Sequence, residues 1–214
     1  GRPTGYRRHD RSTEGVGRVV IIALIPGHGN RQTRTGAAQY HPGAVSGDMV
    51  EAVLVRQLAE EIQKRAPKAV QIFDEPTPGG PLRSYTARTR AAHRWLGHSG
   101  LVLHLHCNGG AGTTLYSLAM ADPRSKLGAR RAEELCKALA GAPTLQRLAP
   151  IKPMLAARPV WAKAANLVGM SWRAPAGVCG VLLEWGFVDQ PTAGEVYSRA
   201  AMVEVAEAIA DLTR

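Results

Sequence analysis

The sequence predicts a single α/β domain, in which a mostly parallel twisted sheet carries helices on both faces. Short apolar runs typical of buried strands alternate along the chain with segments whose apolar residues recur at helical spacing. Such alternation favours a parallel sheet, because parallel neighbours need a crossover connection and a helix usually provides it. The length of 214 residues is enough for one well-buried domain and too short for two typical ones.

The first predicted strand covers 18–25, where a continuous apolar and β-branched run ends at Pro26-Gly27. A run of this kind suits a strand that is buried on both faces of its sheet. Four further strands are predicted at 70–73, 101–106, 114–120 and 178–183.

Four helices are predicted, at 48–65, 82–96, 124–139 and 194–212. The first has a clear amphipathic pattern, since apolar residues recur at helical spacing from Val50 to Ile62 before Pro67 stops the helix. The segment 141–177 is rich in proline and weakly periodic, so we expect a loop region there with one short helix or strand.

Composition limits the classes of partner. The formal charge is +10 and the pI is near 10.1, which calls for a polyanionic neighbour such as nucleic acid, anionic lipid or bacterial cell wall. Aromatic residues are only 5% and no nucleic-acid motif is recognised, so we expect no nucleic-acid binding. No apolar run approaches the length that crosses a bilayer, so we expect no stable membrane insertion.

The start of the chain differs in composition from the rest. Residues 1–18 are basic and contain glycine without an apolar core, so we expect a flexible leader ahead of a domain at 19–214. Earlier removal of a signal peptide stays open. Cys107, Cys136 and Cys179 are an odd number set far apart, which argues against a disulfide framework.

Four residues that can carry chemistry lie near the predicted ends of strands. His28 follows the first strand, His106 ends the strand at 101–106, and Glu184 follows the last apolar run. Glu51 lies in the first turn of a helix that can face the same edge. In open α/β sheets, reactive groups collect beyond the carboxyl ends of the strands. Two imidazoles and a carboxylate, with a fourth position left to water, form the usual ligand set of a hydrolytic zinc site, and a further carboxylate supplies the base.

Each of these residues also has an interpretation without function. A histidine between glycines, such as His28, is commonly a turn residue, and Glu51 complements the helix dipole as first-turn acids do. His106 and Glu184 are harder to explain in this way, because buried imidazoles and carboxylates need polar partners. The four residues together are far more specific than any one of them.

The order of these residues resembles that of the zinc-dependent N-acetylmuramoyl-L-alanine amidases, the amidase 3 family. The matching segments are Ile25-Pro26-Gly27-His28-Gly29, Glu51 with its apolar helix, Leu103-His104-Leu105-His106-Cys107-Asn108, and Leu182-Leu183-Glu184-Trp185-Gly186-Phe187. The resemblance runs from about Val19 to the C-terminus and is weakest in the helix that carries Glu51. It implies that His28, Glu51 and His106 bind zinc (Zn2+) and that Glu184 is the catalytic acid/base.

Two residues beside His106 need an interpretation of their own. His104 stands where the family commonly has serine, and two residues apart on a strand means the same face. It either competes as a ligand or supports one, and we favour support because His106 is the residue followed by Asn108 in the family pattern. We interpret Cys107 as a small packing residue, since nothing indicates an oriented thiolate of low pKa.

Two further positions bear on the match. Asp48 lies one helical turn before Glu51, but the apolar spacing downstream favours Glu51 as the ligand. The asparagine that usually closes the last motif is replaced around Asp189-Gln190, which puts a structural hydrogen bond in doubt.

The resemblance implies a hydrolase that cuts the lactyl–L-alanine amide bond of peptidoglycan, with Glu184 moving the proton. Two alternatives stay open, namely a cell-wall-binding module of the same fold without activity, and another zinc carboxypeptidase or amidohydrolase. We expect a monomer that acts on the cell wall, in the periplasm or outside the cell. It is either a phage endolysin, made in the host cytoplasm and released to the wall, or a secreted bacterial amidase.

The basic excess is concentrated in two stretches without acidic residues. We expect one or both stretches to rim the active-site cleft and to attract stem-peptide carboxylates and the anionic wall or outer membrane. The alternative is that they are solvated surface charge. The stretches carry Lys137, Arg147, Lys152, Arg158, Lys163 and Arg173 before Glu184, and Arg83, Arg88, Arg90 and Arg94 before His106.

Overall fold

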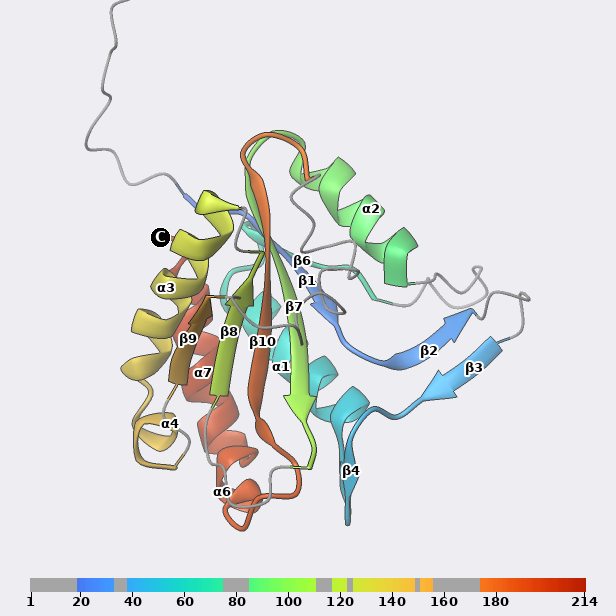
Figure 1. The fold of residues 1–214 in the computed structure, drawn as a ribbon, viewed down its shortest axis with the longest axis vertical. Helices are drawn as coiled ribbons and strands as arrows, with labels where there is room; N and C mark the ends of the chain where they lie inside the picture. The colour runs from blue at the N-terminus through green and yellow to red at the C-terminus, as the bar shows by residue number, and fades with distance from the viewer. Residues whose placement is uncertain are drawn as a thin grey trace, which may run out of the picture.

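The computed structural model describes residues 19–32, 38–74, 85–110, 117–122, 125–148, 151–155 and 174–214. Residues 1–18, predicted to form a leader, lie outside this part of the chain. A six-stranded sheet forms the centre of the described part, and helices pack on both of its faces (Figure 1). The prediction of an α/β domain with a mostly parallel sheet is therefore confirmed.

The main sheet has the spatial order β6-β1-β7-β10-β8-β9. The strands are β1 (Ile22–Pro26), β6 (Val70–Ile72), β7 (Gly100–Asn108), β8 (Ser117–Ala121), β9 (Ile151–Leu155) and β10 (Val178–Phe187). β6, β1, β7 and β10 are parallel neighbours, whereas β8 runs antiparallel to β10 and parallel to β9. The carboxyl ends of four strands therefore meet at one edge of the sheet.

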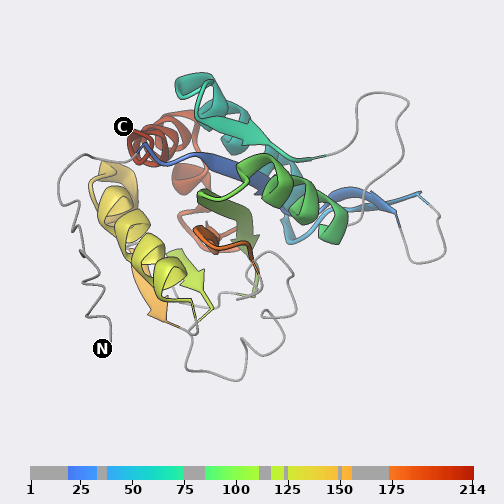
Figure 2. The same cartoon turned by 90° about the horizontal axis from the view of Figure 1, so that it is seen from above.

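The helices form two layers (Figures 1 and 2). One face of the sheet is covered by α1 (Glu51–Arg65), α3 (Lys126–Ala140) and α7 (Arg199–Asp211). The other face is covered by α2 (Tyr85–Leu96). Two shorter helices, α4 (Pro143–Leu148) and α6 (Ala193–Val196), pack beside α7. None of the helices in the described part of the chain is long and apolar enough to cross a membrane.

Alternation of side chains along β7 explains the two layers. Leu101, Leu103 and Leu105 are buried in the layer of α1 and α7, whereas Val102 is buried in the layer of α2. Complete burial of such a side chain stabilises the fold by about 1.5–3 kcal/mol. Because a slip of one residue would move every leucine to the other face, the core also determines where His106 lies.

Two elements lie within the described residues of 141–177, where we expected one short helix or strand. α4 begins with Pro143, which suits a first helical position because proline has no amide hydrogen to lose there. β9 is an edge strand, where Pro153 is tolerated, and it pairs with β8. The helix predicted at 194–212 is interrupted, because the Ser198 side chain caps a new helix by accepting from the Ala201 amide at 3.3 Å.

The loop after β1 contains two small hairpins that we did not predict. One pairs β2 (Gly29–Gln32) with β3 (Ala38–His41), and the other pairs β4 (Val45–Ser46) with β5 (Met49–Val50). These strands are too short and too polar to show a pattern of their own in the sequence. The second hairpin ends directly at α1, so it sets where that helix begins.

Candidate metal centre

The register of three parallel strands brings the predicted site residues to one edge of the sheet. His106 of β7 is the direct neighbour of Glu184 in β10, and Leu105 is the neighbour of Pro26 at the end of β1. The Gly27 amide donates to the Leu105 carbonyl at 2.7 Å, so β1 leads the following residue to the level of His106. β7 and β10 continue beyond residues 106 and 183, at which we expected them to end.

The turn after β1 is shaped by a glycine and by a strained histidine. A Cβ atom on Gly27 would lie 2.5 Å from Nδ1 of His106, so the close approach of this ring requires glycine. His28 has a φ of 60°, in the left-handed region that residues other than glycine rarely adopt. Such a conformation costs about 1–3 kcal/mol and is concentrated at functional sites.

Glu51 opens α1 and is held as a carboxylate from two sides. Its Oε1 accepts from the Cys107 amide at 3.0 Å, and its Oε2 accepts from the Ala44 amide at 2.8 Å. Nδ1 of His106 lies 2.9 Å from Oε1, and Nε2 of His28 lies 3.2 Å from Oε2. Burial acts to raise the pKa of Glu51, but hydrogen bonds with both histidines and Ala44 outweigh it and lower the pKa to about 2.

These three side chains form a group that fits a metal ion. One ligand atom from each of His28, Glu51 and His106 lies within 4.8 Å of the others. Gly43 leaves the space open, because a Cβ atom there would lie 2.7 Å from Cδ2 of His28 and closer still to Oε2 of Glu51. Two imidazoles and an ionised carboxylate are the donor set of hydrolytic zinc sites. The low pKa of Glu51 keeps that carboxylate ready for a cation at neutral pH.

Glu184 stands beside this group in a partly buried position, as the neighbour of His106 in β10. Its Oε2 has no hydrogen-bond partner within the described part of the chain. Burial raises the pKa of Glu184 to about 7, while the charge of His106 lowers it and that of Glu51 raises it. A β-bulge follows between Glu184 and Phe187, with Gly186 at a φ of 79°. The carboxyl group is thus able to take up and release a proton near neutral pH.

The structure places the competing residues outside the metal group. His104 is fully buried in the α2 layer, where burial and then the charges of His106, Arg88 and His93 lower its pKa well below the usual value. Asp48 is exposed in the turn between β4 and β5. Burial raises the pKa of the Cys107 thiol well above its usual value, in agreement with a packing role.

One residue of the site was missed by sequence reasoning. His41 lies at the end of β3, opposite Gly29 of β2, and its Nδ1 is 2.7 Å from Nδ1 of His28. Pro42-Gly43 is a turn signal directly after it, but a turn signal does not indicate which distant residue its neighbour will face.

The segment after β10 also contributes a structural contact. Asp189 accepts from the Gly110 amide at 2.7 Å, and the Val188 amide donates to the Asn108 carbonyl at 2.9 Å. These bonds tie the end of β10 to the loop after β7. At the position where we expected a hydrogen bond to be in doubt, Asp189 supplies one, and the neighbouring Gln190 is buried.

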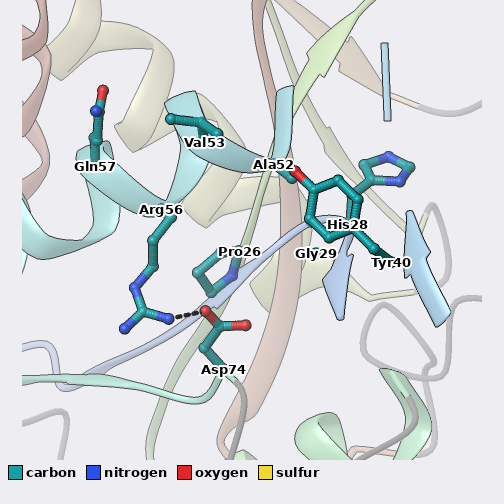
Figure 3. A pocket seen from close by; sticks show the side chains of 10 residues that line it. Pro26, His28, Gly29, Tyr40, Ala52, Val53, Arg56, Gln57 and Asp74 are labelled. Carbon is teal, nitrogen blue, oxygen red and sulfur yellow. Dashed lines mark hydrogen bonds and ion pairs between the residues drawn. The ribbon is translucent and has the colours of Figure 1, made fainter. Parts of the chain in front are cut away.

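A pocket of about 240 Å³ opens beside His28, between the β2–β3 hairpin and α1 (Figure 3). The rings of Tyr40 and His28 lie at one end of the pocket, and the ion pair of Arg56 with Asp74 lies at the other. Val53, which is about half exposed, contributes an apolar wall. The candidate metal group therefore adjoins a hollow with both apolar and polar walls.

The predicted basic rims are only partly present at the described surface. Arg88 was expected in one of them, but it is buried and donates to the Pro26 carbonyl at 3.0 Å and to Asp74 at 3.1 Å. It therefore joins β1 to the segment after β6, because a buried guanidinium needs such partners. Arg90, Arg94 and Lys137 are exposed, and Arg147 pairs with Glu195. Arg83, Arg158, Lys163, Arg173 and the side chain of Lys152 lie outside the described residues.

Comparison with solved structures identifies the fold as that of the N-acetylmuramoyl-L-alanine amidases. An N-acetylmuramoyl-L-alanine amidase from Clostridium difficile 630 has a TM-score of 0.63 and 14% identity, over 91% of this chain and 95% of that chain. Ami1, the N-acetylmuramyl-L-alanine amidase of Mycobacterium smegmatis, has a TM-score of 0.65 and 16% identity, over 92% of this chain and 96% of that chain. The catalytic domain of the endolysin CD27L, which targets Clostridia Difficile, has a TM-score of 0.59 and 18% identity, over 91% and 96%.

No family model and no curated protein matches the sequence. Because the identities to the solved structures are low, the likeness concerns the fold, and it extends over nearly the whole of both chains. The fold expected from the resemblance of the four motifs is confirmed.

Proposed function

We propose that this protein is a zinc-dependent amidase that hydrolyses the bond between the lactyl group of N-acetylmuramic acid and L-alanine in peptidoglycan. The observation that carries the proposal is the position of Glu184 beside three potential metal ligands, with a buried Oε2 that accepts no hydrogen bond from the described residues. The fold shared with peptidoglycan amidases supports the same substrate class.

The two carboxylates of the site differ in the way that two different roles require. Glu51, with a pKa of about 2 and two backbone donors, is suited to remain ionised and, with His28 and His106, to hold the zinc. Glu184, with a pKa raised to about 7 by burial, is suited to exchange a proton. Zinc in such sites supplies a Lewis acid and lowers the pKa of a coordinated water to about 7.

Glu184 performs the proton transfers of the proposed reaction. Its Oε2 takes a proton from the attacking water as the water oxygen bonds to the lactyl carbonyl carbon. Glu184 then gives this proton to the nitrogen of L-alanine as the carbon–nitrogen bond breaks, which leaves a carboxylic acid and an amine. The acid then passes its remaining proton to the amine. No serine or cysteine nucleophile takes part, and Cys107 is buried with a raised pKa.

The pocket beside His28 is where we place part of the extended substrate. Tyr40 and Val53 offer apolar contact area, and Arg56 and Gln57 offer donors at the wall formed by α1. Tyr40→Ala should therefore raise KM for peptidoglycan fragments while zinc content stays unchanged. Unaltered KM in that variant would remove the pocket from the substrate path.

The proposed function is tested by digestion of purified peptidoglycan, with release of N-terminal alanine as the readout. We expect release by the zinc-loaded protein, loss on chelation, and recovery when zinc is restored. Glu184→Gln should keep zinc but lose about 10²–10⁴-fold in rate, as expected for a general acid/base. Glu133→Gln, exposed on α3, is the matched control and should keep both. Near-normal turnover in a folded Glu184→Gln protein would leave the mechanism without its base.

The same assay separates the two alternatives. A wall-binding module of this fold would sediment with peptidoglycan and release no alanine. A zinc carboxypeptidase would release amino acids from the carboxyl end of the stem peptide and leave the lactyl amide intact.

The proposed setting is the cell wall, where the protein acts as a monomer in the periplasm or outside the cell. The net charge of +10 supports contact with an anionic wall or outer membrane. Likeness to an endolysin catalytic domain supports a phage endolysin, released from the host cytoplasm to the wall, and a secreted bacterial amidase is the other form of this proposal.

A further inference from the structure

We propose that His41 is a positioning residue that sets the tautomer of His28, so that Nε2 of His28 presents its lone pair to the metal. The inference rests on the proposed zinc site, because it concerns the second nitrogen of one proposed ligand. It assigns a task to the β2–β3 hairpin, which returns His41 to the end of β1.

The two imidazole rings meet edge to edge. Their centroids are 4.7 Å apart and the ring planes are inclined by 19°, an arrangement that by angle alone resembles stacking. However, Nδ1 of His28 is only 2.7 Å from Nδ1 of His41. Stacked atoms rest about 3.5 Å apart or more, so the short distance requires an in-plane hydrogen bond between the two nitrogens.

The direction of this hydrogen bond follows from a backbone amide. The Gly43 amide, 3.3 Å from Nδ1 of His41, can only donate, so this nitrogen of His41 carries no proton and acts as an acceptor. Nδ1 of His28 must then be the donor in the 2.7 Å contact. With Nδ1 of His28 turned to His41, Nε2 is the nitrogen left to face the metal group, and it lies 3.2 Å from Oε2 of Glu51.

The arrangement also holds a strained residue in place. His28 has a left-handed φ of 60°, and its ring is oriented by His41 on one side and faces Glu51 on the other. A partner on the second nitrogen of a metal-binding histidine fixes the ring orientation and raises the basicity of the ligand. Gly43 serves twice, because its amide directs His41 and its missing side chain leaves room for the metal group.

Two substitutions separate the acceptor from the bulk of the ring. His41→Phe fills similar space without an acceptor, and His41→Asn places an amide oxygen about where Nδ1 lies now. The first readout is zinc affinity, from competition with a chelator of known affinity. We expect His41→Phe to weaken zinc binding by about 10–100-fold, the usual effect of losing such a partner, and His41→Asn to recover most of it.

The second readout needs no metal. Long-range ¹H–¹⁵N spectra of the metal-free protein at pH 8 should show a proton on Nδ1 of His28, and His41→Phe should lower the occupancy of that proton. Absence of a proton from Nδ1 of His28, equal zinc affinity of His41→Phe, or equal loss in both variants would overturn the proposal. If the unaltered protein binds no zinc, the proposed function fails, whereas the tautomer measurement still decides the role of His41.

Discussion

Replacement of Glu184 by glutamine should make the metal-free protein more stable at neutral and alkaline pH, even though it removes the proposed base. The side chain is mostly buried, and its Oε2 accepts no hydrogen bond within the described chain. Burial is the largest cause of the rise in its pKa to about 7, from 4.5 for an ordinary glutamate. The ionised form is therefore a source of instability that glutamine does not share.

The size and sign of the effect follow from proton linkage. Between pH 4.5 and about 7 the folded protein binds the Glu184 proton more tightly than the unfolded chain, so stability falls as pH rises and the loss is complete above about 7. At about 1.36 kcal/mol for each pH unit between the two pKa values, the full loss is roughly 3 kcal/mol. Glu184→Gln removes this dependence, so its advantage over the unaltered protein should grow by roughly 2 kcal/mol from pH 5.5 to pH 8.

Urea unfolding at a series of pH values, with a chelator present, measures this difference. Glu133→Gln removes an exposed glutamate from α3 and controls for the loss of one negative charge, so its stability relative to the unaltered protein should change little with pH. A Glu184→Gln advantage that is the same at pH 5.5 and pH 8, or absent at both, would refute the reasoning, because only a raised pKa generates the dependence.

The remaining predictions concern the metal ligands, Gly43 and the basic surface residues. His106→Ala should empty the zinc site while His104→Asn leaves zinc content unchanged, and metal analysis showing the reverse would make His104 the strand ligand. Gly43→Ala should weaken zinc binding and lower the free energy of unfolding by at least about 1 kcal/mol, since its φ of +77° disfavours a side chain. Unchanged affinity in a chelator competition would show that Gly43 does not keep the space of the metal group open. Hydrolysis of intact wall should fall as salt rises, because exposed charges are screened beyond about 8 Å at 0.15 M. Charge reversal at exposed Arg90 and Arg94 should weaken that dependence, and activity that is flat with salt would assign the basic excess another role.

Much of the fold could be predicted from the sequence, because it depends on short stretches of chain. The apolar run before Pro26 predicted β1, and the helical spacing from Val50 to Ile62 predicted α1. The ends of the strands were harder to predict. β10 continues three residues past Glu184 through a bulge that depends on its neighbour β7. We expected one short helix or strand within 141–177 but could not place β9, because its pairing with β8, and not a local pattern, makes it a strand.

The candidate site also had features that could be predicted from the sequence and features that could not. The positions of His28, Glu51, His106 and Glu184 in the sequence were enough to predict that they meet, because parallel strands end at one edge. Their opposite proton affinities could not be predicted, since the low pKa of Glu51 depends on hydrogen bonds, whereas Oε2 of Glu184 receives none from the described residues.

The sequence by itself determined the order of strands and helices and the residues that gather at the edge of the sheet. Periodicity and apolar runs are local properties, and they can be recognised without knowing which segments pack together. Only the tertiary structure decided that His41 returns to His28, that Arg88 is buried on Asp74, and that His104 stays outside the metal group. Each of these depends on the approach of segments far apart in the chain, which is set by packing and register and has no counterpart in the neighbouring sequence.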